Sequence, residues 1–289
     1  MGADYFGEAK HRTMSQRRTA IVTGASSGIG QAAAIRLASE GYLVVLAARR
    51  LDRLQAAADR IQEAGGEALV IQTDVSDPEQ IQRLVDQTLE AAGRIDLLVN
   101  NAGYGRLLWL DQQDLVGEID QQIQVNLTGA IQLTRAALPV MLEQKSGQIV
   151  FVSSISSFVG VPTYSIYTAT KYGLRGFVES LRRELSGSGV TVTGIYPGAV
   201  ETEFDQHAGV QWKTTRVTPD WLIRTPEQVA GQILRAVKNR RRRIITPAVM
   251  ILPILVNAHF PRLLDWVLSG MFFRENGKTT AWNQAEDPD

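Results

Sequence analysis

Tyr167 and Lys171 stand four residues apart, a spacing that places a phenol and an ammonium on one face of a helix. A cation beside a phenol favours the phenolate and lowers its pKa, as a general acid or base at neutral pH requires. Ser154 lies thirteen residues before Tyr167 and directly follows an apolar run that is expected to be a strand. Ligands bind outside the carboxyl ends of parallel strands. Tyr167 and Lys171 therefore predict general acid or base chemistry, and Ser154 lies where a ligand is expected to bind.

Gly24, Gly28 and Gly30 follow an apolar run at 19–23 and open a segment of helical periodicity. Their spacing, G-x3-G-x-G, differs from the G-x-G-x-x-G dinucleotide fingerprint, but the physical basis is the same. Glycines let the backbone approach a pyrophosphate, whose charge is stabilised by the amino end of the helix. We therefore expect a dinucleotide to bind at this first strand–helix turn.

Arg49 and Arg50 end the second expected strand. An NAD site would carry an acidic residue there, about 20 positions after the glycines, to hold the ribose 2′-hydroxyl. Two guanidiniums instead suit bidentate contact with a 2′-phosphate. The alternative is a pair of solvated arginines, although a helix start does not favour cations. NADP(H) is therefore expected to be preferred over NAD(H), with the nearby Asp52 as the feature that argues against it.

Short apolar or β-branched runs alternate with longer segments of helical periodicity along most of the chain. Such alternation predicts right-handed crossovers and an α/β fold with a doubly wound parallel sheet, Rossmann-like, of about seven strands in a single domain. Strands are expected at 19–23, 43–47, 68–72, 95–99, 148–152, 190–195 and 243–246, and helices at 28–40, 50–64, 78–92, 118–138, 166–185 and 226–239.

Composition excludes several classes of protein. The 289 residues are 44% hydrophobic, which excludes a mainly disordered chain, and 30 Lys and Arg balance 30 Asp and Glu. A dedicated nucleic-acid binder would carry a basic excess, so no nucleic-acid partner is expected. The absence of Cys excludes disulfides and thiolate chemistry, and three scattered His make no metal-ligand pattern. No G-x-S-x-G surrounds Ser154, which argues against a serine hydrolase.

Seven short motifs occur in the order in which short-chain dehydrogenases/reductases carry them. Over residues 19–203 the chain resembles that family, and similarity continues through the helix expected to end near 239. The motifs are Thr23–Gly30 (T-G-x3-G-I-G), Asp74-Val75, Asn100–Gly103 (N-N-A-G), Val125-Asn126, Ser153-Ser154, Tyr167-x3-Lys171 and Tyr196-Pro197-Gly198.

The resemblance implies a catalytic tetrad of Asn126, Ser154, Tyr167 and Lys171. In this interpretation Tyr167 exchanges the proton with the substrate oxygen, and Ser154 hydrogen-bonds the same oxygen. Lys171 lowers the pKa of Tyr167 and holds the nicotinamide ribose, while Asn126 holds a water of a proton relay. The family's spacing favours Ser154 over Ser153.

The resemblance also implies a set of cofactor-binding residues spread over the first six strands. The set is Gly24, Ser26, Ser27, Gly28, Ile29, Gly30, Arg49, Arg50, Asp74, Val75, Asn100, Ala102, Gly103, Tyr167, Lys171, Pro197, Gly198, Val200 and Thr202.

The function expected from these features is NADP(H)-dependent hydride transfer between nicotinamide and a ketone, an aldehyde or a secondary alcohol. A homodimer or homotetramer is expected, and the small-molecule substrate is expected to be hydrophobic. One alternative is a non-catalytic dinucleotide sensor or scaffold, against which the intact tetrad argues. Another is a peripheral-membrane lipid carbonyl reductase. The residues expected to form an apolar lid and pocket are Leu107, Leu108, Trp109, Phe158, Val159, Val161, Pro162, Phe204, Trp212 and Trp221.

Three segments are expected: a flexible one at 1–18, the Rossmann-like domain at 19–246, and an apolar extension with a polar tail at 247–289. No apolar run precedes residue 19, so a cytoplasmic location is expected. Residues 244–261 lack charge but contain three prolines, which disfavours a straight membrane-spanning helix. Beside the basic run at 238–243, the extension either covers the pocket or a partner subunit, or makes weak, salt-sensitive membrane contact through 238–273.

Overall fold

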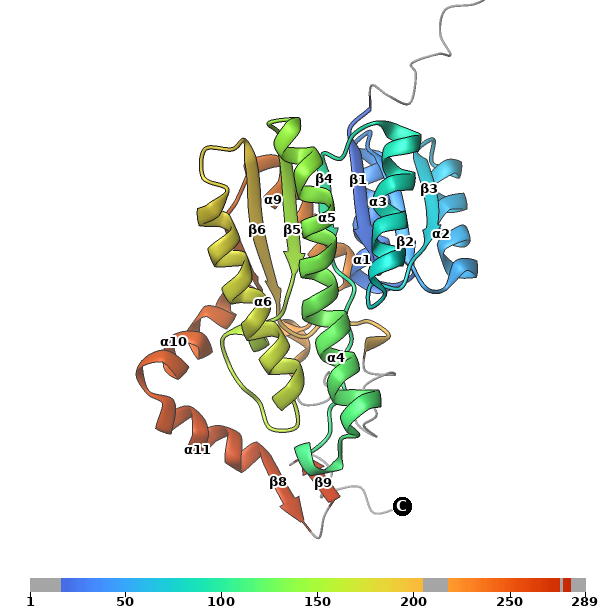
Figure 1. Ribbon diagram of the computed structural model, residues 1–289. Coiled ribbons are helices and arrows are strands. Elements are labelled where there is room, and N and C mark those ends of the chain that lie inside the picture. The colour runs from blue at the N-terminus through green and yellow to red at the C-terminus, as the bar shows by residue number, and fades with distance from the viewer. Residues whose placement is uncertain (1–16, 205–217, 276–277, 282–289) are drawn as a thin grey trace, which may run out of the picture.

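A seven-stranded sheet forms the centre of the computed structural model, which describes residues 17–204, 218–275 and 278–281 (Figure 1). All neighbouring strands pair in parallel, in the order β3-β2-β1-β4-β5-β6-β7. The prediction of a single doubly wound domain is confirmed. The strands are β1 (Thr19–Thr23), β2 (Leu43–Ala48), β3 (Glu67–Gln72), β4 (Leu97–Asn100), β5 (Gly147–Val152), β6 (Val190–Pro197) and β7 (Arg243–Thr246).

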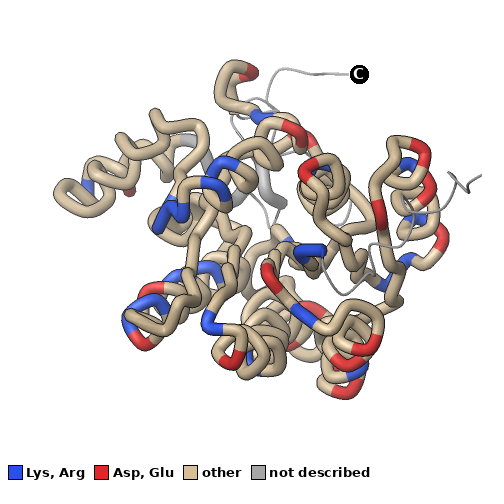
Figure 2. Tube along the Cα trace, turned by 90° about the horizontal axis from the view of Figure 1, so that it is seen from above, with Lys and Arg blue, Asp and Glu red and all other residues tan. Residues whose placement is uncertain are grey.

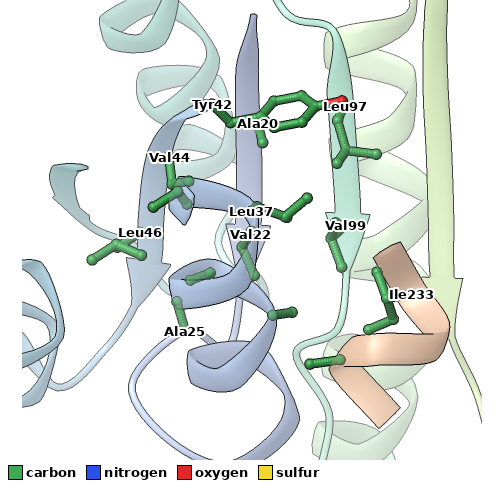
Figure 3. Close-up of a cluster of buried hydrophobic side chains, with 14 of the residues drawn as sticks. Ala20, Val22, Ala25, Leu37, Tyr42, Val44, Leu46, Leu97, Val99 and Ile233 are labelled. Carbon is green, nitrogen blue, oxygen red and sulfur yellow. The ribbon is translucent and has the colours of Figure 1, made fainter. Parts of the chain in front are cut away.

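Helices cover both faces of the sheet, because successive strand residues point to opposite sides. Ala20 and Val22 of β1 pack into one core, whereas Ile21 packs into the other. Figure 3 shows the first core, where Leu37 of one helix lies beside Val22 of β1 and Ile233 of another lies beside Val99 of β4. The helices of this core are α1 (Gly28–Ser39), α2 (Leu51–Glu63) and α9 (Pro226–Asn239); those of the other are α3 (Pro78–Ala92), α5 (Gly129–Glu143) and α6 (Ser165–Glu184).

Two helices begin where a capping residue followed by proline predicts a start. The Asp77 carboxylate accepts hydrogen bonds from the backbone N–H groups of Glu79 (2.9 Å) and Gln80 (3.2 Å) at the start of α3. At α9, Thr225 and Gln228 form a reciprocal capping box. Proline fits the first turn because its missing N–H would have no partner inside the helix.

The regular helix expected over 118–138 is wrong in its first half. Two π-helical turns, Leu115–Asp120 and Gln124–Thr128, flank the short α4 (Gln121–Ile123), and regular α-helix begins only at α5. Gln122 is buried here and accepts a hydrogen bond from the Arg106 backbone N–H (3.0 Å). Apolar periodicity cannot reveal a segment that is positioned by a buried amide.

Beyond β7 the chain continues into two helices and a hairpin at the edge of the fold (Figure 1). Among the described residues no single helix is long and apolar enough to cross a membrane; α10 and α11 pass only as a pair, bent by 114° at their junction. The division of the chain near residue 246 stays a prediction, and the expectations for residues 1–16 and Trp212 lie outside the described residues. The elements are α10 (Ile251–His259), α11 (Pro261–Met271), β8 (Phe272–Glu275) and β9 (Lys278–Ala281).

Candidate active site

The turn after β1 is shaped by glycines at positions that exclude a side chain. Gly24 and Gly28 have φ of 65° and 53°, in the left-handed region. A Cβ atom on Gly30 would overlap the Gly24 carbonyl and lie 2.5 Å from Asn101 Nδ2. Asn101 holds the turn by donating Nδ2–H to the Thr23 carbonyl (2.9 Å). The backbone of this turn is therefore open to a close approach by a ligand.

The amino end of α1 meets that turn and faces a cavity of about 780 Å³. Among the described residues, no side chain caps this end, and the first turn carries no acidic residue. The cavity is lined here by Gly24, Ser26, Ser27 and Gly28. Unpaired N–H groups and the helix dipole favour an anion at such a point. These residues fit the pyrophosphate of a dinucleotide.

Arg50 lies beside this turn and is bound on two sides. Its Nε and Nη2 donate to Ser26 Oγ (3.3 and 3.2 Å), and Nη2 also donates to Ser27 Oγ (2.7 Å). Its Nη1 donates to Glu203 Oε2 (2.9 Å), and Arg53 binds the other oxygen of that carboxylate. Hydrogen bonds from Arg53 and Arg50 lower the pKa of Glu203. Sequence reasoning missed Glu203 and Arg53, because nothing in the spacing links residues this far apart in the chain.

Arg49 is the more exposed of the two arginines that end β2, with 68% of its side chain accessible. Its Nη1 lies 3.9 Å from Asp74 Oδ2, a long ion pair. Asp74 Oδ1 accepts hydrogen bonds from the Ser76 backbone N–H (2.9 Å) and hydroxyl (2.7 Å), which fixes the turn after β3. Arg49, Asp74 and Val75 line the same cavity as the glycine turn.

Tyr167 and Lys171 lie at the other end of the cavity, one turn apart on α6, and both are buried. Lys171 Nζ is 5.3 Å from the centroid of the Tyr167 ring. The described part of the chain places no carboxylate within ion-pair distance of this ammonium. Ser154, two residues beyond β5, lies within hydrogen-bond reach of the Tyr167 hydroxyl, and its Oγ also contacts Ser156 Oγ (3.3 Å). The structure thus brings together the three side chains that the spacing had linked.

The pKa of Tyr167 moves in the direction opposite to the expectation. Burial raises it to about 12, and the hydrogen bond from Ser154 opposes this shift only in part. Burial also lowers the pKa of Lys171 to about 8. In a medium of low dielectric the neutral form of each group is favoured, so burial outweighs the effect of one neighbour on the other. At neutral pH the phenol keeps its proton and the amine is mostly charged.

Asn126 sits in the second π-helical turn, and its amide is occupied by the backbone of Tyr104. Its Oδ1 accepts from the Tyr104 N–H (2.9 Å), while Nδ2 donates to the Tyr104 carbonyl (2.7 Å) and to Thr170 Oγ1 (3.3 Å). A Cβ atom on Gly103 would lie 3.1 Å from Asn126 Oδ1 and 3.4 Å from Lys171 Nζ. Asn126 therefore joins the segment after β4 to α6, immediately beside Lys171.

Five residues of the expected cofactor set do not line the cavity. Asn100 points to α5 and donates Nδ2–H to Thr134 Oγ1 (3.0 Å), whereas the neighbouring Asn101 lines the cavity. Asn101 is the second residue of the N-N-A-G motif, so the motif could have identified it as a cavity residue. Pro197, Gly198 and Val200 lie beside β7 and Arg224, and Gly30 acts through the shape of the turn. The expected residues that do line it are Gly24, Ser26, Ser27, Gly28, Ile29, Arg49, Arg50, Asp74, Val75, Ala102, Gly103, Tyr167, Lys171 and Thr202.

The apolar surroundings of Tyr167 include part of the expected pocket. Leu107, Val161, Tyr164 and Phe204 cluster with Tyr167, and the Phe204 ring centroid is 5.4 Å from that of Tyr167. Phe158 and Val159 do not join this cluster. They pack instead against Tyr196 and Leu264, because the chain turns away after Ser154 toward α11. Trp221 is largely exposed.

This combination of fold and site is that of a nucleotide-binding oxidoreductase. The family model for short chain dehydrogenases matches residues 18–211, and the chain belongs to that family. It is 37% identical over 220 residues to a 3-oxoacyl-[acyl-carrier-protein] reductase of Synechocystis, covering 75% of this chain and 87% of the relative. It is 32% identical over 271 residues to 11-beta-hydroxysteroid dehydrogenase A of Sesamum indicum, covering 90% and 77%.

Solved structures with this fold contain either cofactor. A metagenomic short-chain oxidoreductase in complex with NADP is 32% identical, with a TM-score of 0.67 over 79% of this chain and 96% of its own. A short chain dehydrogenase/reductase from Burkholderia phymatum in complex with NAD is 27% identical, with a TM-score of 0.76 over 87% and 96%. A nicotinamide cofactor is common to both, so this fold accommodates NAD as well as NADP.

Proposed function

We propose that the protein is an NADP(H)-dependent reductase of hydrophobic ketones or aldehydes, or catalyses the reverse oxidation of secondary alcohols. The observation that carries this proposal is the buried Tyr167, in contact with Ser154 and Lys171, at one end of the cavity whose other end is the glycine turn. A protein that only sensed dinucleotides would gain nothing from two buried ionisable groups whose pKa values are shifted.

Tyr167 acts as the proton donor in carbonyl reduction. With a pKa of about 12 it keeps its proton at neutral pH and donates it to the substrate oxygen, which Ser154 also hydrogen-bonds. A nicotinamide held in this cavity would supply the hydride for the carbonyl carbon, and the proton from Tyr167 would complete the conversion of C=O to CH–OH. Lys171, charged at neutral pH, stabilises the tyrosinate that remains until solvent restores the proton.

The substrate is hydrophobic in this proposal. The hydrophobic side chains that pack with the Tyr167 ring are Leu107, Val161, Tyr164 and Phe204, and the Lys171 ammonium is the charged group beside it. A sugar would leave its hydroxyls facing these side chains without hydrogen-bond partners, which is costly in free energy.

The proposed preference for NADP(H) rests on Arg49 and Arg50, at the end of the cavity opposite Tyr167. Arg49 is exposed, and among the described residues its guanidinium forms only a long ion pair, so it can bind a 2′-phosphate without losing a strong partner there. Arg50 lies beside the glycine turn but shares its guanidinium with Glu203. Arg49 is accordingly the principal phosphate ligand in this proposal, and Arg50 is the second.

A panel of carbonyl compounds assayed with NADPH and with NADH tests the proposal. We expect oxidation of NADPH with bulky apolar ketones or long-chain aldehydes, and little with open-chain sugars of similar length. Titration calorimetry should show tighter binding of NADPH than of NADH. NADPH binding with no turnover of any compound by the wild-type protein would favour the sensor instead.

A further inference from the structure

The outward face of α10 and α11 is the largest concentration of exposed apolar side chains in the described residues. The described residues include sixteen large hydrophobic side chains that are exposed, and eight of these lie between positions 249 and 267. Trp266 is 73% exposed and Phe260 65%. Contiguous apolar surfaces of this kind mark interaction sites in soluble proteins. The eight are Val249, Ile251, Leu252, Leu255, Phe260, Leu263, Trp266 and Val267.

The opposite face of the same two helices is fixed to the fold. Ile254 and Val256 of α10, with Leu264 and Leu268 of α11, pack against the cluster that contains Phe158, Val159 and Tyr196. Asn257 Nδ2 donates a hydrogen bond to the Phe158 carbonyl (2.8 Å). With the inner face anchored by these contacts, the outer face cannot turn into the same core.

The charges near this face are arranged for an anionic partner. From Ile244 to Gly270 only Arg262 and Asp265 are charged, and Figure 2 shows this part of the trace almost entirely in tan. Arg240–Arg243, immediately before it, are exposed, and within the described ranges none of them forms an ion pair. Their backbone is held in place, because the Arg241 carbonyl accepts from Thr193 Oγ1 (2.5 Å) and that of Arg242 from the Gly194 N–H (3.2 Å).

We propose that this face docks on the surface of a bilayer that contains anionic lipid. The 114° bend at the α10–α11 junction lets the two short helices lie in the interface rather than cross it. Phe260 and Trp266 enter the boundary between headgroups and acyl chains, while Arg240–Arg243 contact lipid phosphates.

A second copy of the chain fits this surface less well than lipid does. In a two-fold dimer formed through this face the same patch would meet itself, and Asp265 is the one acidic residue that positions 244–270 would offer to the arginines of the second copy. Anionic headgroups, in contrast, would supply phosphates for the whole arginine run.

The docked face adjoins the segment that leads to the active site. Phe158 and Val159 contact the inner side of α10–α11, and the same segment continues to Val161 and Tyr164, which pack on Tyr167. A bilayer on the outer face would therefore supply apolar substrate close to this segment. This consequence alone rests on the proposed function; the docking itself does not.

Co-sedimentation with vesicles tests the docking, using the full chain and vesicles of phosphatidylcholine with or without phosphatidylserine. We expect binding only when phosphatidylserine is present, and we expect high salt to weaken it.

Leu252→Glu with Trp266→Glu should reduce the bound fraction about tenfold or more, since two exposed apolar side chains lose their burial in lipid. Trp221→Glu is the matched control, because this tryptophan is 65% exposed but lies outside the patch, and it should bind like wild type. Arg241→Ala with Arg242→Ala should weaken binding while leaving the apolar face intact.

Thermal unfolding of each variant shows that a loss of binding is not a loss of fold. Failure of the wild-type chain to bind vesicles with phosphatidylserine would overturn the proposal. So would retention after extraction with alkaline carbonate, which indicates insertion across the bilayer. If light scattering showed a dimer that Leu252→Glu with Trp266→Glu converts to monomer, and lipid did not bind, the face would be an interface between copies. Activity on a water-soluble carbonyl compound tests the enzymatic function separately.

Discussion

The two ends of the 780 Å³ cavity hold their ionisable groups in opposite environments. At the glycine turn, Arg50, Arg53 and Glu203 compensate one another in a partly exposed cluster. At the other end Tyr167 and Lys171 are buried, and the part of the chain that is described offers Lys171 no carboxylate. Exposed, compensated charges can exchange partners at little cost and so select a ligand, whereas buried charges keep shifted pKa values and suit proton transfer.

The largest effect is expected from Tyr167→Phe. Removing the hydroxyl removes the proton donor, so turnover should fall by about 10²–10⁴-fold, while NADPH binds as in wild type. Tyr172→Phe is the control, because Tyr172 lies on the same helix with an exposed side chain. Steady-state kinetics and calorimetry measure both quantities. Activity of Tyr167→Phe within about tenfold of wild type would remove this residue from the mechanism.

Lys171→Met should reveal the free energy that burial of the ammonium costs. Folding lowers the pKa of Lys171 from 10.5 to about 8, so between these values the unfolded chain binds one more proton than the folded chain. Stability must then rise with pH across this window, by on the order of 3 kcal/mol. Denaturant unfolding at several pH values should show this rise in wild type relative to Lys171→Met. Parallel pH dependences of the two proteins would contradict the burial of a charged amine.

A smaller effect is expected at the other end of the cavity. Arg49→Ala with Arg50→Ala should cost NADPH about tenfold or more in affinity, since each charge-assisted hydrogen bond contributes about 1.5–3 kcal/mol. NADH lacks the 2′-phosphate and should be nearly unaffected. Arg183→Ala, which removes an arginine from the far end of α6, is a control for net charge. An equal loss for both cofactors would show that the arginines do not read the phosphate.

The smallest effect is expected from Glu203→Gln. The carboxylate competes with a 2′-phosphate for Arg50, so its neutral isostere should tighten NADPH binding by about two- to fivefold and leave NADH unchanged, within the range for an exposed ion pair. Turnover should change little, because the described partners of the Glu203 carboxylate are Arg50 and Arg53 rather than Tyr167 or Lys171. If NADPH bound more weakly instead, the carboxylate would be positioning Arg50 rather than competing for it.

The same contrast explains which features the sequence could predict. Strands β1 and β7 were predicted with their observed bounds, because an apolar or β-branched run carries its own signal, and the glycine turn has a local steric cause. The ion pair between Arg50 and Glu203 joins residues 153 positions apart, so no local pattern contains it. The direction of the Tyr167 pKa depends on burial by the whole fold, which the spacing to Lys171 does not report.

The π-helical turn at Gln124–Thr128 makes the active site depend on the number of residues as well as on their chemistry. Such a turn holds one residue more than an α-helical turn, so deleting the exposed Gln124 would let the backbone relax into regular α-helix. Everything before the deletion would then rotate by about 100° around the helix axis relative to α5. The hydrogen bond from the Arg106 backbone N–H to Gln122 Oε1 would be lost, although no side chain of the tetrad had been altered. Insertions and deletions in this stretch are thus a stricter probe of the site than most substitutions.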